Sequence, residues 1–245
     1  MAVFRNVLFL AVAAGIISGV VMTALQAVFT VPLILQAETY EGAAPAHNHY
    51  AAVTDESSAA QAAHEHDEDA WAPADGTERA LFNVLANLVT GIGFALVLIA
   101  GSEAVGGISG WRPGLVWGLA GFGIFTLAPG LGLPPELPAM PAADLVSRQF
   151  WWIGTAVATA AGLGLIAFRR EAWLSVLGLA LIVAPHLIGA PRPASYETPV
   201  PESLHHSFVV AVTMTNLVFW VVLGAAVAML RGRFMPSPAA QPRLA

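Results

Sequence analysis

Histidine and carboxylate side chains gather in one stretch of this chain, where they could bind a divalent metal ion. Four of the seven histidines fall within twenty residues, in two pairs that each skip one position: His47, His49, His64 and His66. Carboxylates directly follow the second pair. Imidazole and carboxylate together suit borderline ions such as cobalt, nickel and zinc. The pattern therefore predicts a weak capture site, and a solvated acidic loop with incidental histidines is the alternative.

A second set of candidate ligands lies in two proline-rich segments further along the chain. His186 follows Pro185, which lacks a backbone N–H and is expected to open the end of a helix. Glu136 and Asp144 lie in the other segment, and we predict that they converge with His186 into a nitrogen and oxygen metal site. The alternatives are structural: a carbonyl holds His186 in place, and Asp144 caps a helix and pairs with Arg148.

The composition excludes several classes of chemistry. Apolar residues make up 57% of the chain and charged residues 11%, whereas soluble domains carry about 25% charged residues. Cysteine is absent, which excludes thiolate metal sites and disulfides. All ten basic residues are arginine, so the chain has no lysine for a Schiff base or for a phosphate-binding GxxxxGK loop. We predict no catalytic residues, no resident cofactor, and neither nucleotide nor nucleic acid among its partners.

Apolar stretches long enough to cross a bilayer, about 20 residues each, recur along the chain. We predict six spans, with the membrane part of the first ending near Phe29: 5–38, 80–102, 112–131, 148–168, 172–189 and 207–230. Only three charged residues separate the fourth from the fifth, so these two should form a tight antiparallel pair. The third and fifth both end in Ala-Pro and are the two that could instead be re-entrant.

The arginines predict the orientation, because positive residues stay in the cytoplasm. With both termini inside, seven arginines lie inside and only Arg79, Arg148 and Arg192 lie outside. Fourteen of the sixteen acidic residues and all seven histidines then fall outside. We therefore expect the protein to reside in a bacterial inner membrane, with both termini cytoplasmic and its histidines facing the periplasm.

The expected organisation is one integral membrane domain, residues 1–245, of the all-α class. Residues 38–79 are acidic and poor in branched apolar residues, which predicts a mobile outer loop. The proline-rich segments 129–147 and 185–206 are expected to be ordered, irregular backbone at the outer face. Pro129 and Pro185 are 56 residues apart, as are Pro135 and Pro191. This spacing suggests that the six spans form three related antiparallel hairpins.

The same proline-rich segments resemble a known family. The runs LAPGLGLPPELP, MPAAD, RQFWW and APHLIGAP, with PLILQAETYE and WAPADGTERALFNVLANLVTGIGFAL before them, are similar to the predicted bacterial cobalt transporter subunit CbtA. The resemblance covers nearly the whole chain. It implies a polytopic inner-membrane protein of cobalt uptake, which often works beside a small single-span partner with histidines of its own. That family is often described with five spans, whereas the apolar stretches here number six.

These observations favour a membrane subunit that collects cobalt, with nickel or zinc as other possible ions, at the outer face and passes it through or to a partner. Two other classes remain open. A non-transporting scaffold subunit would have a sealed helical core without a polar cavity. A haem or quinone protein would need facing imidazoles within the membrane, and His186 is the only histidine that comes close to such a position.

Overall fold

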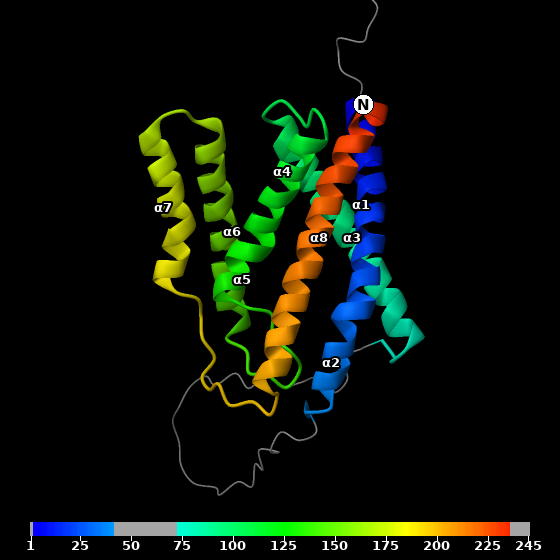
Figure 1. The fold of residues 1–245 in the computed structure, drawn as a ribbon, viewed down its shortest axis with the longest axis vertical. Helices are drawn as coiled ribbons and strands as arrows, with labels where there is room; N and C mark the ends of the chain where they lie inside the picture. Colours follow the sequence, from blue (N-terminus) through cyan, green and yellow to red (C-terminus); the bar gives the residue numbers. More distant parts are fainter. Residues whose placement is uncertain (1, 42–72, 236–245) are drawn as a thin grey trace, which may run out of the picture.

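The protein is described by a computed structural model, which covers residues 2–41 and 73–235. Within these two ranges the regular elements are all helical, and no strand occurs there (Figure 1). The elements are α1 (Ala2–Phe29), α2 (Val31–Glu38), α3 (Thr77–Glu103), α4 (Trp111–Phe122), the π-helix η2 (Gly123–Leu127), α5 (Ala128–Gly132), α6 (Leu145–Phe168), α7 (Ala172–Ile188) and α8 (Glu202–Phe234). The all-α prediction is confirmed.

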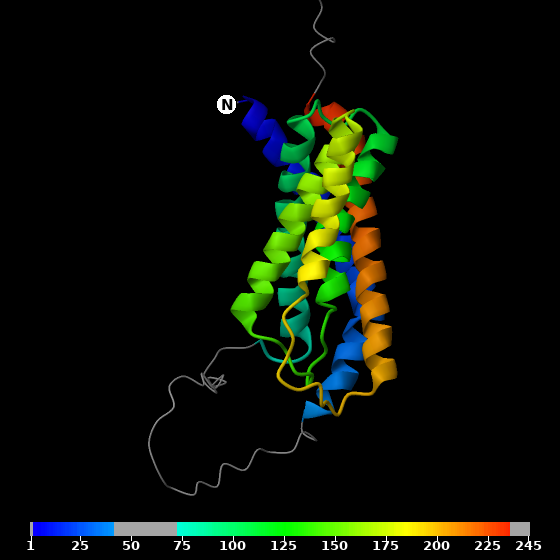
Figure 2. The same cartoon turned by 90° about the vertical axis from the view of Figure 1, so that its left-hand side faces the viewer.

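The helices run between two ends of an elongated bundle, as both views show (Figures 1 and 2). The start of α1, the end of α8 and the α3–α4 and α6–α7 connections lie together, and we call this the terminal end. The opposite end carries α2 and the connections 133–144 and 189–201, and we call it the proline-rich end. The chain passes between the two ends with each long helical segment in turn.

Five of these segments, within the described ranges, are long and apolar enough to cross a membrane. They are Val3–Phe29, Thr77–Glu103, Trp111–Gly132, Leu145–Phe168 and Glu202–Phe234. The predicted fifth span is helix α7, an apolar helix of 17 residues. At 1.5 Å per residue it is about 25 Å long, which is slightly shorter than a typical 30 Å hydrocarbon core. The difference between five and six spans therefore concerns this one short helix.

Helix α8 lies at the centre of the larger helix group. It packs along α1 on one side and along α4 on the other, and α1 also packs along α3. Buried residues from these four helices form one apolar cluster, with Trp220 and Leu223 of α8 almost fully enclosed. Outward-facing side chains such as Phe150 and Val157 of α6 stay exposed, as expected for a surface in contact with lipid.

Helices α6 and α7 form a separate pair with a very close crossing. A Cβ added to Gly162 of α6 would meet the backbone oxygen of Gly178 of α7, and the reverse also holds. In a membrane, small residues at such crossings let two backbones approach and gain dispersion contacts. The predicted tight pairing of the fourth and fifth spans is thus present in the structure.

The other helices do not pair in the way that three equivalent hairpins would. The first expected hairpin, α1 with α3, is packed along its length, but α4 has α8 as its main partner rather than α6. Helix α8 packs on α1 and α4, while α7 packs on α6. The sequence spacing does not reveal which helices pack together. A repeated loop sequence determines the local backbone conformation, but it does not determine the helix on which the adjoining span packs.

The first proline of each predicted segment stands inside a helix rather than in irregular backbone. Pro129 belongs to α5 and Pro185 to α7, and each lies three residues before the last residue of its helix. The carbonyl of Pro129 accepts from the N–H of Leu133 at 2.9 Å, and that of Pro185 from Gly189 at 3.0 Å. The two prolines therefore hold equivalent positions in their helices, but Pro185 does not open its helix.

A π-helix immediately precedes Pro129 and was not foreseen in the sequence. The N–H of Ala128 bonds the carbonyl of Gly123, five residues back, instead of the usual four. Proline has no N–H for the carbonyl four residues earlier, and its ring crowds that carbonyl. The wider π turn accommodates the proline, so α4, η2 and α5 continue as one span.

The irregular connections at the proline-rich end pack against each other and against two helices. Leu137 from one connection and Val200 from the other are buried with Ala37 of α2 and with Leu204 and Phe208 of α8. The hydroxyl of Thr198 donates to the carbonyl of Ala139 at 3.0 Å. The two connections therefore form a joint cap over this end of the bundle.

Candidate functional site

The cap encloses a cavity of about 370 Å³ between the two proline-rich connections. We call it the proline-lined cavity. Its polar lining residues come from three parts of the chain: Glu136, His186, Arg192, Tyr196 and His205. Prolines and glycines provide much of the remaining wall, including Pro134, Pro141, Pro191 and Pro193. The structure thus brings Glu136 and His186 to one cavity, and the metal site expected there stays a prediction.

His186 lies near the end of α7, with its ring against Trp151 of α6. The two rings meet edge to face, with centroids 5.9 Å apart. The Trp151 indole N–H donates to the carbonyl of Pro185 at 3.3 Å, and the indole also covers Gly132 at the end of α5. Trp151 therefore ties the ends of α5 and α7 together and supports the imidazole, which stays half-buried.

Glu136 is bound to a cation of the protein itself. Its carboxylate Oε2 is 3.1 Å from a guanidinium nitrogen of Arg148 on α6, and both side chains are about three-quarters buried. The ion pair holds the 133–144 connection against α6 and neutralises the carboxylate. An ion in the cavity would have to share this carboxylate with Arg148.

Asp144 takes the structural role that the sequence left open. It is the N-cap of α6, and its Oδ1 accepts from the N–H of Ser147 at 2.8 Å and from the Ser147 hydroxyl at 2.7 Å. The N-cap position satisfies donors at the helix start and favours a negative charge there. Asp144 does not belong to the lining of the proline-lined cavity, so the structure does not bring it to His186 and Glu136.

His205 joins the cavity from the first turn of α8, and sequence reasoning did not select it as a ligand. Its Nε2 lies 3.2 Å from the carbonyl of Pro135. A carbonyl can only accept, so Nε2 carries a proton, and the neutral ring that makes this bond has its lone pair on Nδ1. The signal available in the sequence was its place shortly after Pro199 and Pro201, in the same proline-rich segment as His186.

The proline-lined cavity is a partial donor set rather than a closed metal centre. Across residues 2–41 and 73–235, no three histidine or carboxylate side chains gather closely enough to hold an ion. The predicted loop ligands His47, His49, His64 and His66 lie outside the described residues. What the described part of the chain offers is two imidazoles and a shared carboxylate around a cavity much larger than a single ion.

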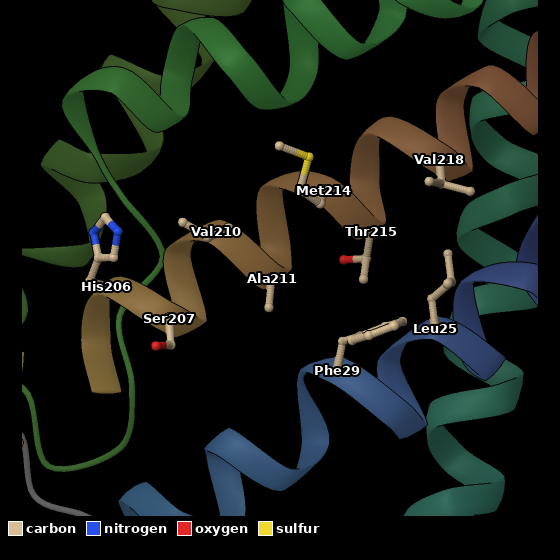
Figure 3. A pocket seen from close by; sticks show the side chains of 9 residues that line it. All are labelled: Leu25, Phe29, His206, Ser207, Val210, Ala211, Met214, Thr215 and Val218. Atoms are coloured by element: carbon tan, nitrogen blue, oxygen red, sulfur yellow. The ribbon is translucent and has the colours of Figure 1, made fainter. Parts of the chain in front are cut away.

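Two other cavities lie along the helices and are apolar. One, of about 530 Å³, runs between α1 and α8, where Figure 3 shows Leu25 and Phe29 facing the row of α8 side chains from Ser207 to Val218. His206 is the single ionisable residue in its described lining. The other, of about 360 Å³, lies between α3, α4, α6 and α8 around Trp117 and Phe125. Neither offers a set of metal donors.

Two of the amide residues within the spans connect α1 and α3. The Asn87 side-chain amide of α3 donates to Gln26 Oε1 at 2.6 Å and to Thr23 Oγ1 at 3.1 Å, both on α1. Trp220 of α8 likewise donates to Thr126 of η2 at 3.3 Å. Interhelical hydrogen bonds of this kind hold membrane helices together. These groups therefore fit a packing role better than a role in ligand binding.

Charge divides between the two ends of the bundle. Six of the described arginines lie at the terminal end: Arg5, Arg112, Arg169, Arg170, Arg231 and Arg233. Three lie at the proline-rich end: Arg79, Arg148 and Arg192. Arg231 of α8 forms a two-point ion pair with Glu103 of α3, at 2.7 and 3.1 Å. All described histidines lie at the proline-rich end.

The comparison with protein families decides the identity of the chain. A model of the family described as "Probable cobalt transporter subunit (CbtA)" matches residues 4–232, which is nearly the whole sequence. This chain belongs to the CbtA family. No curated protein and no solved structure gives a significant match to it. The predicted resemblance is thus confirmed, and the CbtA description supports transport of cobalt by an assembly of which this chain is a subunit.

Proposed function

We propose that this protein is the inner-membrane subunit through which a CbtA-type uptake system receives cobalt from outside the cell. The single observation that carries the proposal is the proline-lined cavity, whose lining includes His186, His205 and Glu136, at the end of the bundle that carries the described histidines. Family membership indicates which ion is transported, and the cavity is where we propose that it is received. Imidazole nitrogen and carboxylate oxygen together suit Co²⁺.

The charge distribution supports an orientation in which the proline-rich end faces out. The terminal end carries the excess of arginine, and positive residues favour the cytoplasm. Both termini would then be cytoplasmic, and α7 would complete a sixth crossing. The histidine-containing stretch between α2 and α3 would lie on the same outer side as the cavity, because both of its ends do.

In this account cobalt is first collected by the histidines of the predicted loop 38–79 and then received in the cavity. Weak ligation at each stage favours transfer over storage, since a closed site of three or four protein ligands would release the ion slowly. The next step passes the ion inward or to a partner subunit, for which a small single-span protein with its own histidines remains the proposal.

A non-transporting scaffold subunit is the second candidate. It is favoured by the two apolar cavities along the helices, because neither provides described donors for an ion between the two ends of the bundle. In that case the protein would receive cobalt at the cap and hand it to a partner that forms the path.

Cobalt accumulation in cells tests the proposal. Cells deprived of other cobalt uptake should accumulate the ion when they carry this chain with its partner. Replacing His47, His49, His64 and His66 together by alanine should lower uptake at low external cobalt and leave it nearly normal at high cobalt. The reason is that the loop only raises the efficiency with which dilute cobalt is captured. Uptake by the partner alone equal to that of both would contradict any role in transport. If uptake needs both chains, the scaffold candidate remains open only when the partner itself forms a pore.

A further inference from the structure

We infer that the proline-lined cavity receives cobalt together with a small organic carboxylate ligand, such as a hydroxycarboxylate, and not as the bare hydrated ion. The inference rests on the proposed function and adds the chemical class of the substrate. It comes from the charge, the donors and the size of the cavity.

The charge of the cavity disfavours a free dication. Glu136 and Arg148 form a neutral ion pair, whereas Arg192 lines the same cavity and has no carboxylate within 4.0 Å among the described residues. With both histidines neutral, the cavity and its ion pair carry a net charge of about +1. A hydrated Co²⁺ would therefore meet net repulsion, while a complex with a polycarboxylate is neutral or negative and would be attracted.

Glu136 is the one carboxylate among the described residues that lines the cavity with Arg192. Asp144 is engaged at the start of α6, and Glu197 and Glu202 do not belong to the lining. Arg192 is exposed at the cavity and can reorient toward a ligand. A guanidinium group matches a carboxylate in geometry, since two parallel N–H donors meet two oxygens.

The donors suit a complex that is only partly bound by protein. His186 and the Nδ1 of His205 offer two nitrogens, and Glu136 shares its oxygens with Arg148. Arg192 and the Tyr196 hydroxyl offer hydrogen-bond donors, which a metal ion cannot use and a carboxylate can. The histidines and Glu136 would therefore bind the metal ion, and Arg192 and Tyr196 would bind the carboxylate of the same complex.

The size of the cavity agrees with a small organic complex. Small-molecule sites occupy about 300–1,000 Å³, and the cavity has about 370 Å³. Single-ion sites need far less space, because their ligands contact the metal at about 2 Å. The prolines of the wall, whose rings fix φ, would help to keep this volume open before the ligand arrives.

Equilibrium dialysis of the purified full-length chain in detergent tests the inference. Radioactive Co²⁺ is kept at one fixed free concentration while citrate is raised, so that only the concentration of the cobalt–citrate complex changes. Retained cobalt should rise with citrate. In Arg192→Gln the affinity for the complex should fall roughly three- to fivefold, the range of a solvent-accessible charge pair, with binding of Co²⁺ alone not reduced. Arg233→Gln, which removes an exposed charge at the terminal end, is the matched control and should behave as wild type.

The outcomes separate the two levels of the proposal. Retained cobalt that stays constant or falls as citrate rises would overturn the inference and leave cobalt reception in place. An equal rise in wild type and Arg192→Gln would also overturn it, because the charge of the cavity would then play no part. No retained cobalt under any condition would instead contradict the proposed function itself.

Discussion

At the residue scale, the cavity combines groups that the sequence could identify with contacts that it could not. His186 and Glu136 were predicted from their place beside prolines, and the structure brings them to one cavity. The partner of Glu136 was not predicted: the sequence offered a pair of Asp144 with Arg148, four residues apart, only as one alternative. Arg148 instead reaches back twelve residues to Glu136, a contact set by the path of the cap. Local spacing carries no information about such a contact.

The Glu136–Arg148 pair gives a prediction that distinguishes a ligand from a structural anchor. Glu136→Gln should weaken cobalt binding by the purified protein about tenfold, because a ligating oxygen loses its charge. Arg148→Gln should bind Co²⁺ about threefold more tightly, because the guanidinium no longer competes for the carboxylate. Titration of each variant with cobalt measures both values. If the two variants lose affinity to the same extent, the carboxylate acts only through the ion pair.

At the element scale, the helices were easier to predict than their packing. Long apolar stretches require helices in a bilayer, where each backbone group must find a partner within the segment. The π-helix before Pro129 and the packing of α4 on α8 were missed. The π-helix depends on how the backbone of one span accommodates a proline. The packing of α4 on α8 depends on close contact between small residues, such as Gly118 against Gly224. Both are properties of contacts between turns and helices rather than of hydropathy.

The crossing of α6 and α7 can be tested with two glycines on one helix. Gly162→Ala places a methyl group against the backbone oxygen of Gly178 and should destabilise the protein by about 1–3 kcal/mol, as overpacking does. Gly164→Ala, two residues further along α6, meets no atom within 4 Å and should be neutral or slightly stabilising. Thermal unfolding in detergent, followed by tryptophan fluorescence, compares the two. Equal midpoints would show that the crossing is looser than described.

At the scale of the whole molecule, composition and arginine placement predict a membrane protein with two unlike ends. The described residues agree, with six arginines at the terminal end and all described histidines at the other. The number of spans could not be settled from sequence, because α7 is an apolar helix of only 17 residues. Its length lies near the lower limit for crossing a bilayer, about 17 residues, where hydropathy alone does not decide.

The orientation predicts which end an impermeant reagent can reach. The chain has no cysteine, so single cysteines can be introduced without background. Ser195→Cys, in the connection between α7 and α8, should react with a membrane-impermeant maleimide added to intact cells, and Ser237→Cys should react only after the membrane is opened. The reverse pattern would place the cavity in the cytoplasm and rule out reception of cobalt from outside.

Replacement of His186 is the most direct test of the account, because its imidazole both packs against Trp151 and lines the cavity. His186→Phe keeps an aromatic ring against Trp151 and removes both nitrogens, while His186→Asn keeps a polar group and removes the ring. If His186 receives cobalt, both variants should reach normal abundance in the membrane, and cobalt uptake at low external cobalt should fall about tenfold or more in each. If His186 only supports the cap, His186→Phe should transport like wild type. That result would contradict the claim that cobalt is received in the proline-lined cavity.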